Sequence, residues 1–138
     1  MSNNDVDAMV LPIRSDEDVV RLRQSVREQM IAAGFSLIDQ TKMITAASEL
    51  ARNTLRYGGG GEAHMQKLLH GSRKGLGLTF IDRGPGIPDI ARALTDGYTT
   101  GGGMGLGLSG AKRLADEFDI DSAPGQGTTV RICKWKPY

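Results

Sequence analysis

The sequence predicts a single α+β domain, a two-layer sandwich in which helices cover one face of a mostly antiparallel sheet. Segments with helical and with strand periodicity follow one another in the order βαα-ββ-(α)α-ββ, and glycine- or proline-rich stretches separate them. Strands joined by short turns pair antiparallel, and helices on one face of such a sheet complete a core. The chain has 138 residues, which is enough for one core, so we expect residues 1–138 to form one domain.

The first half of the chain is predicted to hold one strand and two helices. Residues 6–13 read as a short strand. Ser15 is expected to cap a helix that Gly34 ends, because serine favours the N-cap position and glycine the residue after the last turn. A second helix is predicted over 36–57, where apolar residues recur along one side, and four consecutive glycines end it.

The second half is predicted to be mostly sheet. Strands at 62–70 and 74–82 are expected to form a hairpin, although two glycines lower the strand propensity of the second one. The remaining predicted elements are a short helical piece at 88–94, a helix at 108–118, and strands at 118–123 and 128–135 around the turn "PGQG".

The composition excludes several classes of partner. Seventeen Lys and Arg against sixteen Asp and Glu give a net charge of +1, whereas nucleic-acid and membrane surfaces require a concentrated basic face. Cys133 is the single cysteine, so no intrachain disulfide forms, and this suits a reducing compartment. The first residues lack the pattern of a signal peptide, and no stretch has the length of a transmembrane helix. We expect a cytoplasmic protein without nucleic-acid or membrane partners.

The segment 99–110, "TTGGGMGLGLSG", holds six glycines in twelve residues. It contains a G-x-G-x-x-G pattern, which binds dinucleotides where it directly follows a buried strand. The residues before it here lack a strand pattern, so a dinucleotide-binding loop is disfavoured. A Walker motif is absent from the sequence. Glycines just before an amphipathic helix expose backbone N–H groups at a helix N-terminus, where anions bind. A phosphate cradle is therefore the favoured interpretation, and a flexible surface loop is the alternative.

Two further segments carry candidate site residues. Asp82 follows a predicted strand and opens "DRGPGIP", and its carboxylate suits an amino group such as that of adenine. Glu49 and Asn53 lie four residues apart on a predicted helix and share one face. An asparagine oxygen suits Mg²⁺, and a neighbouring glutamate can orient or deprotonate a nucleophile. The alternative for the Asp82 segment is an ordinary Pro-Gly turn, and the alternative for Glu49 and Asn53 is a solvated polar stripe on an amphipathic helix.

These motifs occur in a particular order: E-x-x-x-N, D-x-G-x-G, G-x-G-x-G and a G-T-[TV] turn that contains Thr128. This succession resembles the ATP-binding (Bergerat) fold of gyrase, heat-shock chaperone ATPases, histidine kinases and MutL, the GHKL superfamily. From roughly residue 13 to 135, stretches such as "ITAASELARNTLRYGGGG" and "DRGPGIPDI" resemble the RsbT-type switch-protein serine kinases. Related anti-sigma-factor kinases usually have a longer lid before the glycine segment and often a His at the position of Tyr57.

The resemblance implies roles for matching positions. Asp82 would contact the adenine amino group with Thr128 nearby, Asn53 would hold Mg²⁺, and Glu49 would act on the substrate serine. The other implied nucleotide-binding residues are Gly84, Gly86, Ile87, Thr99, Thr100, Gly101, Gly103, Gly105, Gly107 and Leu108.

The resemblance also implies a function. The chain would transfer the γ-phosphoryl group of ATP to a serine or threonine of a STAS-domain antagonist in a stressosome-like, partner-switching module. It would then activate a downstream phosphatase or cyclase. The alternative is a non-catalytic, nucleotide-dependent binding module or anti-sigma factor that sequesters its partner, and a bare ATPase is a third hypothesis. The presence of both Glu49 and Asn53 favours the enzyme.

Overall fold

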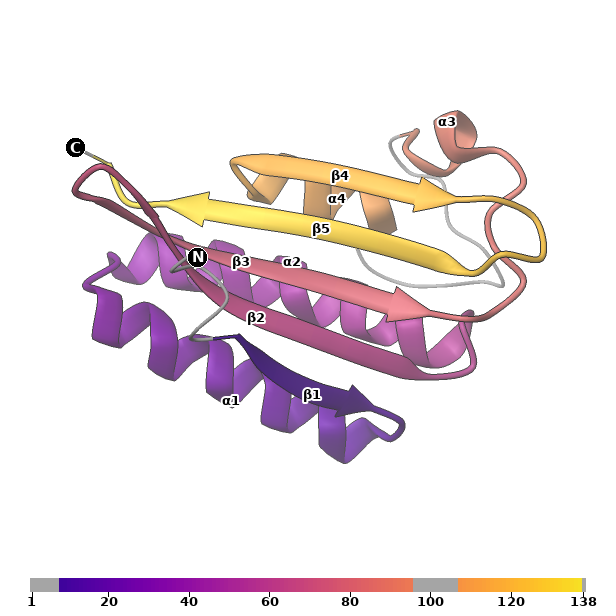
Figure 1. Cartoon of the computed structure of the whole chain (residues 1–138), viewed down its shortest axis with the longest axis horizontal. Coiled ribbons are helices and arrows are strands. Elements are labelled where there is room, and N and C mark those ends of the chain that lie inside the picture. The colour runs from indigo at the N-terminus through magenta and orange to yellow at the C-terminus, as the bar shows by residue number, and fades with distance from the viewer. Residues whose placement is uncertain (1–7, 96–106, 138) are drawn as a thin grey trace.

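The computed structural model describes residues 8–95 and 107–137. Within these ranges the chain forms one five-stranded sheet with helices packed against it (Figure 1). The elements are β1 (Met9–Ile13), α1 (Asp16–Ala33), α2 (Leu37–Arg56), β2 (Gly61–His70), β3 (Arg73–Asp82), α3 (Ile90–Ala93), α4 (Gly107–Leu114), β4 (Glu117–Ser122) and β5 (Thr128–Trp135). The strand order is β1-β2-β3-β5-β4, and every neighbouring pair is antiparallel. The predicted fold class is confirmed.

The core lies between the sheet and the helices α1, α2 and α4, which share the far side of the sheet in Figure 1. Side chains from both layers are excluded from water there, and their burial is the main stabilising term of such a fold. The large side chains with at most 2% exposure that anchor this core include Leu22, Val26, Met30, Met43, Leu50, Leu78, Phe80 and Ile132. Within the described ranges, the helices are too short or too polar to cross a bilayer.

The first two helices begin and end where the sequence predicts. Ser15 caps α1 by accepting a hydrogen bond from the backbone N–H of Asp18 at 3.2 Å. Gly34 ends α1 at a φ of 84°, a left-handed conformation that glycine adopts without steric cost. Ser36 caps α2 in the same way, by accepting from the N–H of Asp39 at 3.1 Å. Each cap satisfies a backbone donor that the helix itself leaves unpaired.

The predicted hairpin forms from β2 and β3, which pair from Gly61 opposite Asp82 to His70 opposite Arg73. A glycine inside β3 is compatible with the strand because the neighbouring strand fills the space above it. A Cβ atom added to Gly75 would lie 2.6 Å from the ring of Trp135, so the indole packs directly on the glycine backbone. The glycine that lowers strand propensity is thus required by packing.

One predicted boundary is wrong. The helix expected over 108–118 ends at Leu114, and β4 begins at Glu117. The backbone N–H of Asp116 donates to the carbonyl oxygen of Cys133 at 2.9 Å, so pairing with β5 replaces the next helical hydrogen bond. The sequence pattern at Phe118 fits both a helix and a strand. Its four-residue spacing from Leu114 is helical, and its two-residue spacing from Ile120 is that of a strand, so either structure would direct Phe118 toward the core.

Candidate functional site

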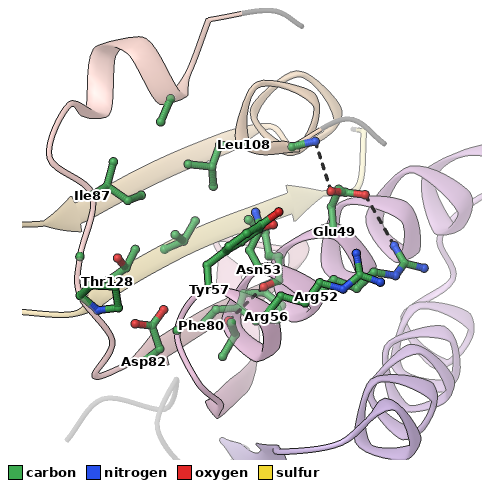
Figure 2. Close-up of a pocket in the computed structure, with 18 of the residues that line it drawn as sticks. Glu49, Arg52, Asn53, Arg56, Tyr57, Phe80, Asp82, Ile87, Leu108 and Thr128 are labelled. Carbon is green, nitrogen blue, oxygen red and sulfur yellow. Dashed lines mark hydrogen bonds and ion pairs between the residues drawn. The ribbon is translucent and has the colours of Figure 1, made fainter. Parts of the chain in front are cut away.

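The last two turns of α2 form one wall of a pocket (Figure 2). Glu49 and Asn53 lie one helical turn apart and both line it, as the four-residue spacing predicts. Glu49 is 9% exposed, which is low for a carboxylate. Arg52 and Arg56 on the same helix also line the pocket, and this brings positive charge to the wall.

The sheet contributes a row of three polar residues where three strands meet. Asp82 is the last residue of β3, Thr128 the first of β5 and Ser122 the last of β4. Thr128 lies directly opposite Asp82 on one side and Ser122 on the other. Residues opposite one another in neighbouring strands point to the same face of a sheet. Asp82 and Thr128 line the pocket, and Figure 2 shows their side chains directed into the same space.

The turn after β3 is shaped by close backbone approaches. Oδ1 of Asp82 accepts a hydrogen bond from the N–H of Gly84 at 2.9 Å. A Cβ atom on Gly84 would lie 2.7 Å from the Cα atom of Gly58, which in turn packs against the side chain of Asp82. Gly86 has a φ of 78°, and a Cβ atom there would collide with the carbonyl oxygen of Ala123. Because Gly58 and Gly84 have no side chains, the turn after α2 and the turn after β3 can pack closely around the Asp82 side chain.

The N-terminus of α4 closes the pocket beside Glu49. The backbone N–H of Gly107 donates to Oε2 of Glu49 at 3.2 Å, and Nη1 of Arg52 lies 3.6 Å from Oε1 (Figure 2). The positive end of the helix dipole and the guanidinium therefore act on the two oxygens of one carboxylate. Glu49 is thus the charged link between α2 and α4.

The pocket has a volume of about 430 Å³, which is within the range of small-ligand sites, roughly 300–1,000 Å³. Apolar side chains make up much of its lining, and the polar groups lie at its two ends. The apolar residues include Leu50, Phe80, Ile87, Leu108 and Val130.

The structure brings most of the sequence-predicted site residues together. Those that line the pocket are Glu49, Asn53, Asp82, Gly86, Ile87, Gly107, Leu108 and Thr128. Gly84 packs behind Asp82 and does not line the cavity. The predicted residues that lie outside the described ranges are Thr99, Thr100, Gly101, Gly103 and Gly105.

Three arginines and one serine are among the residues around the pocket that sequence reasoning missed. Arg52, Arg56 and Arg92 line it from α2 and α3. The spacing of Arg52 and Arg56 repeats that of Glu49 and Asn53, and this periodicity was the available signal. Ser122, which contacts Thr128, gives no signal in the sequence because only strand pairing brings the two residues together.

The two ends of the pocket favour different chemical groups. At the sheet end, the carboxylate of Asp82 accepts hydrogen bonds and suits an amino group. At the end of the pocket beside α4, the Arg52 side chain and the positive end of the α4 helix dipole suit a phosphate chain. The apolar walls between Phe80 and Leu108 suit a planar base. The arrangement fits a purine nucleotide that carries an exocyclic amine.

Comparisons with known proteins agree with this chemistry. The sequence profile of the histidine kinase-, DNA gyrase B- and HSP90-like ATPases matches residues 38–137. The chain is 42% identical over 129 residues to the serine/threonine-protein kinase RsbT of Bacillus subtilis (strain 168), across 94% of this chain and 97% of that protein. It is 28% identical over 123 residues to the anti-sigma F factor of Thermoanaerobacter sp. (strain X514), across 81% of this chain and 85% of that protein.

A solved structure shows the same fold. The RsbU and RsbW domains of a Mycobacterium tuberculosis protein superpose with a TM-score of 0.63 at 19% identity, over 96% of this chain and 34% of that chain. This chain therefore spans about a third of the Mycobacterium tuberculosis chain, and the likeness concerns the fold alone. From the matched profile and the 42% identical relative, the chain belongs to the histidine kinase-, DNA gyrase B- and HSP90-like ATPases and, within them, to the RsbT-like serine/threonine kinases.

Proposed function

We propose that the chain transfers the γ-phosphoryl group of ATP to a serine or threonine hydroxyl of a small partner protein. The observation that carries the proposal is the convergence of Glu49, Asn53, Asp82 and the N-terminus of α4 on one pocket, although these elements lie far apart in the sequence. Phosphoryl transfer depends chiefly on positioning and on neutralisation of charge. A pocket with an adenine end and a cationic end supplies both.

The donor groups in the pocket suit ATP with Mg²⁺. Asp82 and Thr128 would bind the adenine amino group, and Ile87 and Leu108 would contact the base. Asn53 offers a neutral amide oxygen, the kind of ligand that Mg²⁺ takes together with water and phosphate oxygens. Bound Mg²⁺ would neutralise charge on the phosphates. Arg52, which lines the same wall, contributes further positive charge.

Glu49 is the residue proposed to act on the substrate hydroxyl. As the bond between the hydroxyl oxygen and the γ-phosphorus forms, the bond to the β-phosphate oxygen breaks and ADP leaves. The hydroxyl proton passes to the Glu49 carboxylate. The contacts with Gly107 and Arg52 hold that carboxylate at the end of the pocket where the phosphates would lie.

The resemblance to RsbT-type kinases supports a proposal about partners. The substrate would be a STAS-domain antagonist protein in a stressosome-like, partner-switching module in the cytoplasm. The kinase released after phosphorylation would activate a phosphatase or cyclase. Neither nucleic acid nor a membrane is part of this proposal, because the net charge of +1 offers no concentrated basic surface.

The test is phosphoryl transfer from labelled ATP to candidate STAS-domain proteins. We expect Glu49→Gln to lower the transfer rate at least about a hundredfold while it leaves ATP affinity within a few-fold. The matched control is Glu28→Gln, an exposed carboxylate on α1, which should transfer at the normal rate. Transfer by Glu49→Gln at the wild-type rate would refute the role of Glu49.

A second candidate function is a binding module that sequesters a partner according to the bound nucleotide. The similarity to anti-sigma F factors, which includes 31% identity over 101 residues to that of Bacillus licheniformis, favours its consideration. The same assay distinguishes the two functions. A wild-type protein that binds ATP and a partner but transfers no phosphate to any candidate would support the binding module over the kinase.

A further inference from the structure

Ser122 forms three contacts with the groups that surround the adenine end of the pocket. Its Oγ accepts a hydrogen bond from the backbone N–H of Ile87 at 2.8 Å. The same oxygen donates to the carbonyl oxygen of Gly127 at 2.9 Å and lies 2.8 Å from Oγ1 of Thr128. Ser122 does not itself line the pocket, whereas Ile87 and Thr128 do. It therefore acts through its neighbours.

The number of hydroxyl hydrogens determines which residue donates in the contact between Ser122 and Thr128. A serine hydroxyl has one hydrogen and two lone pairs. The carbonyl of Gly127 can only accept, so it takes the hydrogen of Ser122, and the N–H of Ile87 can only donate, so it takes one lone pair. All three contacts are hydrogen bonds only if Thr128 donates its hydroxyl hydrogen to the remaining lone pair of Ser122. Thr128 then offers only lone pairs to the pocket.

We propose that Ser122 is a specificity-determining positioning residue, which makes Thr128 a pure hydrogen-bond acceptor beside the carboxylate of Asp82. Asp82 and Thr128 then both accept hydrogen bonds at this end of the pocket, and neither of the two donates. A 6-amino purine satisfies them directly or through water, whereas a 6-oxo purine places a carbonyl oxygen against two acceptors. This inference rests on the proposed placement of adenine at Asp82 and Thr128.

Ser122 also couples two turns that form the wall of the pocket. Its bond to Ile87 joins the end of β4 to the turn after Asp82, and the N–H of Gly125 donates to the carbonyl oxygen of Pro85 at 2.7 Å in the same place. Loss of the serine hydroxyl removes one of these two links. The position of Ile87 against the base therefore depends on Ser122.

The experiment measures the dissociation constants of ATP and inosine triphosphate for wild type, Ser122→Ala and Ser122→Thr. In Ser122→Ala the hydroxyl of Thr128 is free to turn and donate to the 6-oxo group. We expect the preference for ATP over inosine triphosphate to fall about tenfold, the effect of one hydrogen bond. Ser122→Thr keeps a hydroxyl and should restore the preference. Thr129→Val, on the neighbouring position of β5 that faces the other side of the sheet, is the matched control.

A double variant separates specificity from a loss of packing. If Ser122 acts through Thr128, Ser122→Ala should not change the nucleotide preference in a Thr128→Val background. A general weakening of both nucleotides with an unchanged ratio in Ser122→Ala would overturn the inference and leave the kinase proposal intact. A wild-type protein that binds ATP and inosine triphosphate equally would overturn the adenine assignment as well.

Discussion

Asp82 uses its carboxylate for both the fold and the site. Oδ1 accepts from the N–H of Gly84 and so holds the turn that follows β3. The side chain also faces the pocket, where a second oxygen can accept from a ligand (Figure 2). Gly58 packs so closely against the Asp82 side chain that a larger residue at position 58 would collide with it. Substitutions at this position can therefore separate stability from nucleotide binding.

We predict that Asp82→Asn weakens ATP binding by about 2 kcal/mol, or roughly thirtyfold, because an amide loses the charge-assisted bond proposed above between Asp82 and the adenine amine. Its oxygen can still accept from Gly84, so the free energy of unfolding should change by less than about 0.5 kcal/mol. Asp82→Ala loses both bonds and should cost about 1 kcal/mol more in stability. Calorimetric titration and urea unfolding measure the two effects, with Asp119→Asn, exposed on β4, as the control. Equal ATP affinity in wild type and Asp82→Asn would contradict the assignment.

Cys133 on β5 is fully buried and packs in the interior as a free thiol. Burial raises the pKa of its thiol from 9.0 to about 11, with smaller opposing effects from Arg131 and Glu117. Between pH 9.0 and about pH 11, the folded chain keeps the thiol proton that the unfolded chain releases. The free energy of unfolding therefore falls as the pH rises above about 9.

At pH 10 this difference corresponds to a loss of about 1.4 kcal/mol relative to pH 8. Urea unfolding at the two pH values measures it, and the comparison with Cys133→Ala isolates the thiol from other groups that titrate there. Wild type should lose about that much more stability than the alanine variant. An identical loss in both proteins would show that the thiol ionises equally in the folded and unfolded states.

At the scale of elements, Lys134 holds α4 in place. This buried lysine on β5 donates to the carbonyl oxygen of Leu114, the last residue of α4, at 3.0 Å. Its ammonium group also lies 3.4 Å from Oδ1 of Asp116 and 3.9 Å from Oδ1 of Asp39 in the first turn of α2. A cation at a helix C-terminus stabilises the exposed carbonyl groups. The position of α4, and hence of Gly107 beside Glu49, depends on this contact.

We predict that Lys134→Met lowers the free energy of unfolding by about 2 kcal/mol, because the Leu114 carbonyl and the carboxylates of Asp39 and Asp116 lose their contacts with the ammonium group. This loss of stability is smaller than the loss expected when a fully buried ion pair is broken, because the Asp116 side chain is 40% exposed. Lys74→Met, at an exposed position of β3, should change stability by less than about 0.5 kcal/mol. If the two variants unfold at the same urea concentration, the proposed anchoring of α4 is wrong.

At the scale of the whole molecule, the pocket exists only in the folded chain. Its walls come from α2, β3, β5 and α4, so unfolding of any of these elements destroys it. A ligand that binds only the folded state stabilises that state by mass action.

We predict that ATP with Mg²⁺ at one hundred times the dissociation constant raises the free energy of unfolding by about 2.7 kcal/mol. Thermal unfolding should show this as an increase in Tm of several degrees. The same nucleotide concentration should stabilise Asp82→Asn far less. A rise in Tm that is equal in both proteins would show that the nucleotide binds elsewhere.

The sequence by itself determined the fold class, most element boundaries and much of the pocket lining. Helix caps, glycine breaks and apolar periodicity are local signals, and local backbone preferences produce them. The motif residues Glu49, Asn53 and Asp82 were also readable because each lies within a short pattern.

Only the tertiary structure decided the rest. The end of α4 depends on a hydrogen bond between Asp116 and Cys133, residues that lie on different strands or their edges, and local periodicity fits a helix equally well there. The row of Asp82, Thr128 and Ser122 results from strand register, which no single segment encodes. The direction of the Thr128 hydroxyl follows from that row. Long-range pairing thus determines the hydrogen-bonding character of a site whose residues the local sequence had already indicated.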